Sequence, residues 1–416
     1  MPSRASSASH HQAPNIASEA VVAQMATASL MRSINRSAIL DLIRRHSPIA
    51  RSQIAHQLHI SLPTVMRIVD ELVAEDLVCC RGSAESTGGR PRSLVEFNGS
   101  AYAVVGVDLG GTKMFGTIAD LAGNIQHELY VPHASCEGNG DSLERLCTLI
   151  ERLLAAPRPA GQRIRGIGIG APGITLHPKG IVTLAPSLGW HNLPLKDILS
   201  ERFSLPVFVE NDVNLAALGE LGFGAGRGAR HLVCISIGTG IGAGIIVDGA
   251  LYRGHDQAAG EIGYLLPGAD LLGRRYEGFG ALEGLASGSG IAERGRRALQ
   301  AEGLEPAEDL SAEYVFAAAR RHEPWAERVV SETVDYLGLA IASVSALLNP
   351  EVVILGGSVV RSADLLVDPI RERLQGAVPF LPRLVVSQLG LRAAVMGAIM
   401  LVLNATMEYF VVSRLP

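Results

Sequence analysis

Apolar residues in the first hundred positions recur at helical spacing in three short segments. Ile34, Ala38 and Leu42 stand four residues apart, which predicts a helix that ends at Ser47-Pro48. A second helix is predicted over residues 51–58. A third is predicted over residues 62–74, after Ser61, a residue type common at helix N-caps. Helix, short helix and capped helix in this order are typical of a helix-turn-helix.

The third predicted helix separates an apolar from a polar face. Its apolar positions are Val65, Val69, Leu72 and Val73. The major groove of DNA admits such a helix, and Ser61, Thr64 and Arg67 would lie nearest the base edges and phosphates. We expect Arg51, at the start of the second helix, to contact the DNA backbone.

Two apolar segments after the third helix, residues 77–80 and 93–97, predict strands joined by a polar, glycine-rich hairpin. The tip of this hairpin carries Arg90 and Arg92, suited to phosphates or to the narrow minor groove. Residues 30–98 are therefore predicted to form a winged helix-turn-helix, after a flexible leader over residues 1–29. The alternative is a small helical domain whose arginines are simply solvated.

Charge in this front segment changes the expected stoichiometry. Residues 30–98 contain nine arginines and seven acidic residues, a net charge of only +2. Because phosphate contacts supply most of the affinity for DNA, a single copy would bind weakly. We expect a homodimer or homotetramer on a two-fold operator.

The rest of the chain alternates apolar strands with glycine turns. One strand ends in Asp108 and leads into the turn Gly110, Gly111, Thr112 and Lys113. A second strand, residues 232–237, leads into Gly238, Thr239 and Gly240. Backbone amides in such turns can approach phosphate oxygens, and a carboxylate such as that of Asp108 can hold a hydrated Mg²⁺. Each turn alone fits an ordinary hairpin, whereas the pair predicts a duplicated fold around a nucleotide.

A polar cluster is predicted where the strand over residues 205–209 meets the helix over residues 213–221. Asp212 is a candidate base for a bound hydroxyl, and Asn211 can hydrogen-bond neighbouring hydroxyls. On local sequence alone, Asp212 as a helix cap is the favoured alternative. Further along, Glu261 and Glu283 lie in glycine-rich surroundings. After the strand over residues 352–355, Gly356 and Gly357 form a turn suited to an adenine or ribose.

Composition restricts the class of protein. The 416 residues are 48% hydrophobic and 19% charged with a net charge of −5, which excludes wholesale disorder and gives no general signal for nucleic acid. The longest apolar stretch, residues 393–403, is too short to span a membrane. The five cysteines form no CxxC pair, and no secretory signal is visible. We expect a cytoplasmic protein.

These pieces together resemble the ROK family of repressors, open reading frames and sugar kinases. The resemblance covers roughly residues 30–405 and implies an α/β protein: a winged helix-turn-helix, then a two-lobed actin/hexokinase-like (ribonuclease H-like) ATPase fold over residues 102–405, with a tail over residues 406–416. The front segment is similar to the winged helix of the xylose and N-acetylglucosamine repressors. The matching motifs are residues 108–113, 171–173, 210–214, 238–242 and 355–357.

The resemblance also implies roles for individual residues. In the kinases of this family, the aspartate that matches Asp212 takes the proton from the sugar hydroxyl that attacks ATP. The residues that match Asn211, Glu261 and Glu283 hold the sugar, and we expect Gly173 and Tyr264 beside them. ATP and Mg²⁺ would be cofactors only if kinase activity is retained.

One departure from the family pattern removes the family's zinc site. The family has a His where this chain has Tyr264, and a cysteine-rich run where it has residues 272–283. Tetrahedral zinc needs four ligands, and residues 256–290 contain neither Cys nor His, so no zinc is expected. We expect Tyr264, Tyr276 and Phe279 to hold this loop by packing instead.

The sequence therefore predicts a sugar-responsive transcriptional regulator, most simply a repressor of carbohydrate genes. An active sugar kinase that carries a DNA-binding module is the main alternative. A third reading makes the kinase-like part a dimerisation scaffold without a ligand.

Overall fold

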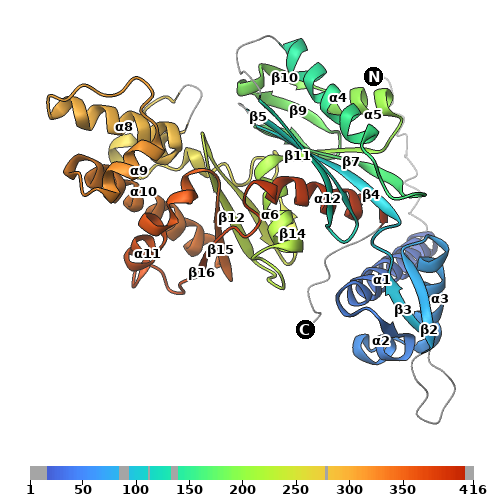
Figure 1. The fold of residues 1–416 in the computed structure, drawn as a ribbon. Coiled ribbons are helices and arrows are strands. Elements are labelled where there is room, and N and C mark those ends of the chain that lie inside the picture. Colours follow the sequence, from blue (N-terminus) through green and yellow to red (C-terminus); the bar gives the residue numbers. More distant parts are fainter. Residues whose placement is uncertain (1–15, 84–92, 111–112, 133–138, 277–279, 408–416) are drawn as a thin grey trace, which may run out of the picture.

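The computed structural model describes residues 16–83, 93–110, 113–132, 139–276 and 280–407 (Figure 1). A winged helix-turn-helix lies beneath a body of two lobes, each built on a five-stranded sheet (Figure 1). Arg90, Arg92, Gly111, Thr112 and Phe279 lie outside the described residues.

The winged helix-turn-helix follows the predicted element order. Its helices are α1 (Ile16–His46), α2 (Arg51–Leu58) and α3 (Leu62–Ala74). Its strands are β1 (Ile49–Ala50), β2 (Val78–Ser83) and β3 (Ser93–Phe97), in the order β1-β3-β2. One expectation was wrong: α1 begins at Ile16, inside the segment expected as a flexible leader. Residues 16–46 contain neither Gly nor Pro, so nothing in the sequence ends the helix earlier.

The first lobe has a mixed sheet in the order β11-β7-β4-β5-β6. β4 (Tyr102–Leu109) pairs antiparallel with β5 (Lys113–Asp120), which pairs with β6 (Ile125–Pro132). On the other side, β7 (Arg163–Ala171) and β11 (Val207–Asn211) run parallel to β4. A small sheet of β8 (Ile174–Leu176), β9 (Ile181–Ala185) and β10 (Trp190–Leu193) and the helices α4 (Asn139–Ala155) and α5 (Leu195–Phe203) complete this lobe.

The second lobe repeats this topology with the sheet order β14-β13-β12-β15-β16. β12 (Leu232–Ile237), β13 (Ile241–Val247) and β14 (Ala250–Tyr252) form the antiparallel part, and β15 (Val352–Gly356) and β16 (Arg383–Val386) are parallel to β12. Its helices are α7 (Ala281–Ala286), α8 (Gly288–Ala301), α9 (Ala312–Arg320), α10 (Pro324–Leu348) and α11 (Ala363–Leu374). The matching strand orders confirm the predicted duplication.

Two helices lie between the sheets of the two lobes: α6 (Asp212–Phe223) and α12 (Ala393–Met407) (Figure 1). Their backbones nearly touch, since a Cβ on Gly397 would lie 1.7 Å from the Leu215 carbonyl oxygen. One continuous core contains buried residues of α1–α3 together with Leu221 of α6 and Leu403 of α12. The helix-turn-helix is therefore packed on the body and is not tethered by a loose linker.

Among the described residues, α10 alone is long and apolar enough to cross a membrane by length and composition. More than half of its most apolar window, 56%, is buried inside the protein, as in a core helix.

Candidate ligand site and DNA-binding face

Two carboxyl groups, those of Asp108 and Asp212, lie close together at the edge of the first lobe that faces the second. Asp108 is the second-last residue of β4, and Asp212 begins α6. Gly170 of β7 lies between them: it pairs with Asp108 in the sheet, and a Cβ there would be 3.3 Å from the Asp212 Cα. The helix cap is not Asp212 but Asn211, whose Oδ1 accepts from the Val213 and Asn214 amides at 2.9 and 3.0 Å. The Asp212 carboxyl, which accepts from Val213 N, is left beside Asp108.

Desolvation controls the charge of this pair. Burial, and then the charge of Asp108, raise the pKa of Asp212 to about 8. Burial also raises the pKa of Asp108 to about 6, against the effect of Lys113. At neutral pH the pair therefore holds about one proton, mostly on Asp212, so it can both donate to and accept from a hydroxyl group.

The sequence-predicted residues Gly173 and Asn211 come together at one wall of the cleft. Asn211 Nδ2 donates to the Gly173 carbonyl at 3.0 Å. Gly173 has φ +79°, and a Cβ there would lie 2.0 Å from the Leu184 carbonyl oxygen, so only glycine fits. The single side-chain oxygen of Asn211 serves the helix cap, and one of the two Nδ2 hydrogens is used on Gly173, which leaves one N–H for a ligand.

Glu261 and Glu283 belong to the second lobe, and Glu261 is close enough to Asp212 to interact with it electrostatically. Glu283 Oε2 accepts from the Ile241 amide at 2.7 Å and would touch a Cβ on Gly240, so it fixes the second glycine turn. Burial, and then the charge of Glu283, raise the pKa of Glu261. Because Glu261 in turn raises the pKa of Asp212, these carboxylates form one electrostatic group across the cleft.

The second glycine turn meets two other backbone turns. The Gly288 amide at the start of α8 donates to the Gly238 carbonyl at 2.7 Å, and Ser289 Oγ donates to the Thr239 carbonyl at 3.1 Å. Gly357, with φ +89°, packs against β12, where a Cβ would lie 2.3 Å from the Ile237 carbonyl oxygen. The residues predicted from the sequence did not include Ser289, although the run Ser-Gly-Ser-Gly at residues 287–290 is typical of a glycine-rich helix start.

The first glycine turn is described only in part. The Gly110 amide donates to the Lys113 carbonyl at 2.8 Å, which closes the turn. The Lys113 ammonium lies 5.9 Å from the centroid of the Tyr130 ring. The predicted phosphate contacts of this turn stay predictions.

A buried network behind the cleft was also missed. Glu210, 1% exposed, accepts from Arg253 Nε at 2.7 Å and from Asn214 Nδ2 at 3.0 Å, and its Oε2 lies 3.3 Å from His177 Nδ1. Burial lowers the pKa of His177, so Arg253 supplies the positive charge. Arg253 follows β14, so this ion pair joins the two lobes. The sequence does contain one sign of this network, because Glu210 is a charged residue at the end of an otherwise apolar strand.

The segment that replaces the family's zinc motif is held differently from our expectation. Tyr264 is 57% exposed and does not pack the loop. The observed contacts are an ion pair between Arg274 and Asp270 at 3.3 Å and a hydrogen bond from the Tyr276 hydroxyl to the Leu271 carbonyl at 3.3 Å. Within the described part of the chain, no group of three or more His, Cys, Asp or Glu side chains is arranged to hold a metal ion.

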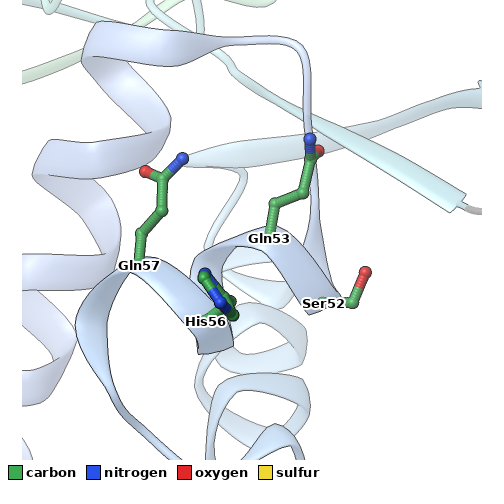
Figure 2. A pocket seen from close by; sticks show the side chains of 4 residues that line it. All are labelled: Ser52, Gln53, His56 and Gln57. Atoms are coloured by element: carbon green, nitrogen blue, oxygen red, sulfur yellow. The ribbon is translucent and has the colours of Figure 1, made fainter.

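On the DNA-binding domain, the predicted residues lie on α2 and α3. Ser61 caps α3, and its hydroxyl lies 2.8 Å from the Thr64 hydroxyl. Arg67 is exposed, whereas Arg51 is ion-paired with Asp70 at 2.8 Å and therefore joins α2 to α3. A hollow of about 320 Å³ on the exposed side of α2 is lined by Ser52, Gln53, His56 and Gln57. Figure 2 shows these four side chains.

The helix α6 connects the two sites. Its first residue is Asp212, and its last, Phe223, has its ring centroid 5.7 Å from the guanidinium carbon of Arg44 in α1. Phe223 also packs on the turn before β6, where a Cβ on Gly123 would lie 2.7 Å from the ring. A helix of this length is about 18 Å long, so the cleft and the DNA-binding domain are one helix apart.

Comparison with known proteins decides the family. The ROK family profile matches residues 104–405, and a winged helix-turn-helix DNA-binding profile matches residues 32–78. The chain belongs to the ROK family. The fold class that the sequence predicted is thereby confirmed, with the DNA-binding domain in front of the two-lobed body.

Relatives of this ROK protein include both regulators and enzymes. It is 31% identical to a putative xylose repressor of Caldicellulosiruptor sp. over 92% of this chain and 99% of that protein. It is 35% identical to a glucokinase of Halalkalibacterium halodurans, over 70% of this chain and 92% of that protein. Among solved structures, a ROK transcriptional regulator described as a homolog of the Escherichia coli MLC protein aligns with TM-score 0.78 and 27% identity, over 91% of this chain and 98% of that one. A Streptomyces griseus ROK glucokinase in complex with glucose and AMPPNP aligns with TM-score 0.62 and 30% identity, over 72% of this chain and 98% of that one.

Proposed function

We propose that this protein is a sugar-responsive transcriptional repressor that binds operator DNA through its winged helix-turn-helix. The similarity to xylose repressors covers 92% of the chain, enough to include both domains, whereas that to a glucokinase covers 70%. A two-fold operator bound by a homodimer or homotetramer in the cytoplasm completes the proposal. The observation that carries it is that α6 begins at Asp212 and ends at Phe223, whose ring contacts Arg44 of α1.

The cleft is chemically suited to a sugar. Asp212, Asn211, Glu261 and Glu283 offer carboxyl and amide groups at hydrogen-bonding reach of several hydroxyls, and exposed Tyr264 can cover one face of a sugar ring. A sugar that draws Glu261 of the second lobe towards Asp212 of the first favours a closed arrangement. A ligand shifts an equilibrium only by its difference in affinity for the two states, and closure supplies such a difference.

The test is operator binding by the full-length protein, followed by fluorescence anisotropy at fixed salt with a panel of pentoses, hexoses and N-acetylhexosamines. We expect one sugar class to weaken operator binding at least several-fold. Asp212→Asn should shift the sugar concentration needed, while operator affinity without sugar stays unchanged. Failure to prefer any DNA sequence would contradict the repressor proposal.

A second candidate, sugar kinase activity, is favoured by the geometry of the phosphate turns. The glycine turn at residues 238–240 and Gly357 can bring backbone amides close to nucleotide phosphates, and Asp108 is suited to Mg²⁺. ATP with Mg²⁺ would supply the transferred phosphoryl group. The raised pKa of Asp212 leaves it mostly protonated at neutral pH, which weakens it as a base. A coupled ADP-release assay with Asp212→Asn as control separates the two functions: sugar-dependent turnover that the substitution abolishes establishes the kinase.

A further inference from the structure

The N-terminal half of α3 presents apolar side chains to solvent. Leu62 is 43% exposed and Met66 45% exposed, and the Pro63 side chain is exposed beside them. Leu62 and Met66 stand four residues apart, so they lie on the same side of the helix. They do not belong to its core face, which consists of Val65, Ile68, Val69 and Leu72.

The polar side chains of α3 are mostly engaged within the domain. The Ser61 and Thr64 hydroxyls bond to each other at the helix cap. Asp70 is paired with Arg51 of α2, and Glu71 with Arg32 of α1 at 2.9 Å. Arg67 is exposed and forms no ion pair with any residue in the described ranges. The surface of α3 that is free for a partner therefore consists of Leu62, Pro63, Met66 and Arg67.

A base edge that complements this surface must offer an apolar group. In the major groove the methyl group at C5 of thymine is that group, and apolar side chains contact it. We propose that Leu62 and Met66 contact thymine methyl groups and so select thymine at two positions of each operator half-site, while Arg67 contacts a guanine or a phosphate. This inference rests on the proposed DNA-binding function and adds the residues and the base chemistry that give sequence preference.

The experiment first selects duplexes from a random pool with the full-length protein. Each thymine of the selected half-site is then replaced by uracil, which removes only the methyl group. Burial of one methyl-sized group corresponds to about a fourfold change in Kd, so we expect losses of about that size at two positions. Met66→Ala should abolish the loss at one position and Leu62→Ala at the other, because the methyl partner is gone. Met66→Leu should retain it.

Two controls separate the possible failures. Leu347→Ala removes a side chain that is 81% exposed on α10 and should leave every thymine-to-uracil effect unchanged. Arg67→Ala should weaken thymine and uracil duplexes equally. If the pool yields no preferred sequence, the DNA-binding function itself fails. If a sequence is selected but uracil binds as well as thymine throughout, or if both alanine variants keep the full methyl dependence, the inference is overturned.

Discussion

The Asp212 carboxyl experiences opposing effects. Desolvation and the nearby charges of Asp108 and Glu261 favour its protonated form, while the Val213 amide favours the charged form, and the raised pKa shows that the first group dominates. The native protein thus binds a proton here over a pH range in which the unfolded chain has lost it. The site stores electrostatic strain that a bound sugar hydroxyl can relieve by hydrogen bonding.

This strain predicts a pH-dependent gain in stability for Asp212→Asn. A carboxyl with a raised native pKa lowers the free energy of unfolding progressively as pH rises from about 4 to about 8. The neutral amide removes that loss, so the variant should match the wild type near pH 4 and exceed it by about 2–4 kcal/mol at pH 9. Urea denaturation across this pH range measures it. A constant difference at all pH values would contradict the assigned environment.

Substitution of the buried Glu210 should instead lower the free energy of unfolding. Glu210→Gln keeps the shape but leaves Arg253 without its charge partner, and Arg253 is partly exposed, so we expect a loss of about 2 kcal/mol in the free energy of unfolding. The control is Glu151→Gln, which removes an exposed partner of Arg202 and should cost less than about 0.5 kcal/mol. Equal effects of both substitutions on the urea midpoint would rule out the interlobe role of Glu210.

Residues in sequence motifs were predictable, and residues in tertiary contacts were not. Asp108, Asp212, Glu261 and Glu283 were identified from their motifs, and the structure brings them into one cleft. Arg253 lies 43 positions from Glu210, and nothing local connects them; their contact depends on how the lobes pack. The packing role expected of Tyr264 failed for the same reason, since exposure is a tertiary property.

At the level of elements, a glycine in a strand is difficult to distinguish from a glycine in a turn. β13 begins at Ile241, directly after the second glycine turn, and contains two further glycines, Gly242 and Gly244. Gly244 lies in that strand because α6 crosses it closely: a Cβ would be 2.5 Å from the Ala217 Cβ. The alternation of glycine and apolar residues in the sequence cannot show whether a glycine forms a turn or lies in a strand that a helix crosses closely. By contrast, the predicted bounds of α2 and α3 match, because their signals, a cap and a short connection, are local.

The crossing of α6 and α12 predicts a strong effect of one methyl group. Gly397→Ala would place Cβ 1.7 Å from the Leu215 carbonyl oxygen, so the helices must separate, at a cost of about 3 kcal/mol. The matched control is Gly284→Ala in α7, where nothing lies within 4 Å and the substitution should be neutral or slightly stabilising. Thermal denaturation compares the two. A Gly397→Ala variant as stable as the control would contradict this packing.

At the scale of the whole molecule, the proposed sugar response requires that α6 couple the site around Asp212 to the DNA-binding domain, through the contact of Phe223 with Arg44. Movement of its N-terminus on closure of the lobes must be absorbed at Phe223, where the ring contacts Arg44, or passed on to α1. The continuous core around α6 and α12 leaves little room to absorb it. The coupling has to be reciprocal: if sugar weakens operator binding by some factor, operator DNA weakens sugar binding by the same factor.

Substitution at the contact of Phe223 with Arg44 should uncouple sugar binding from operator binding while each ligand still binds. In Phe223→Ala and, as a milder variant, Arg44→Gln, we expect sugar to change operator affinity by less than about twofold, because a coupling free energy below about 0.4 kcal/mol remains. In these variants, the sugar Kd measured by calorimetry with operator should also lie within about twofold of the sugar Kd measured without operator. Both experiments measure the same coupling free energy. Phe380→Ala, which truncates a ring that is 74% exposed, should keep the full wild-type coupling. If Phe223→Ala and Arg44→Gln respond to sugar as the wild type does, the signal does not pass through the end of α6. If, within one variant, the effect of sugar on operator affinity differs from the effect of operator on sugar affinity, the two ligands do not act on the same two states.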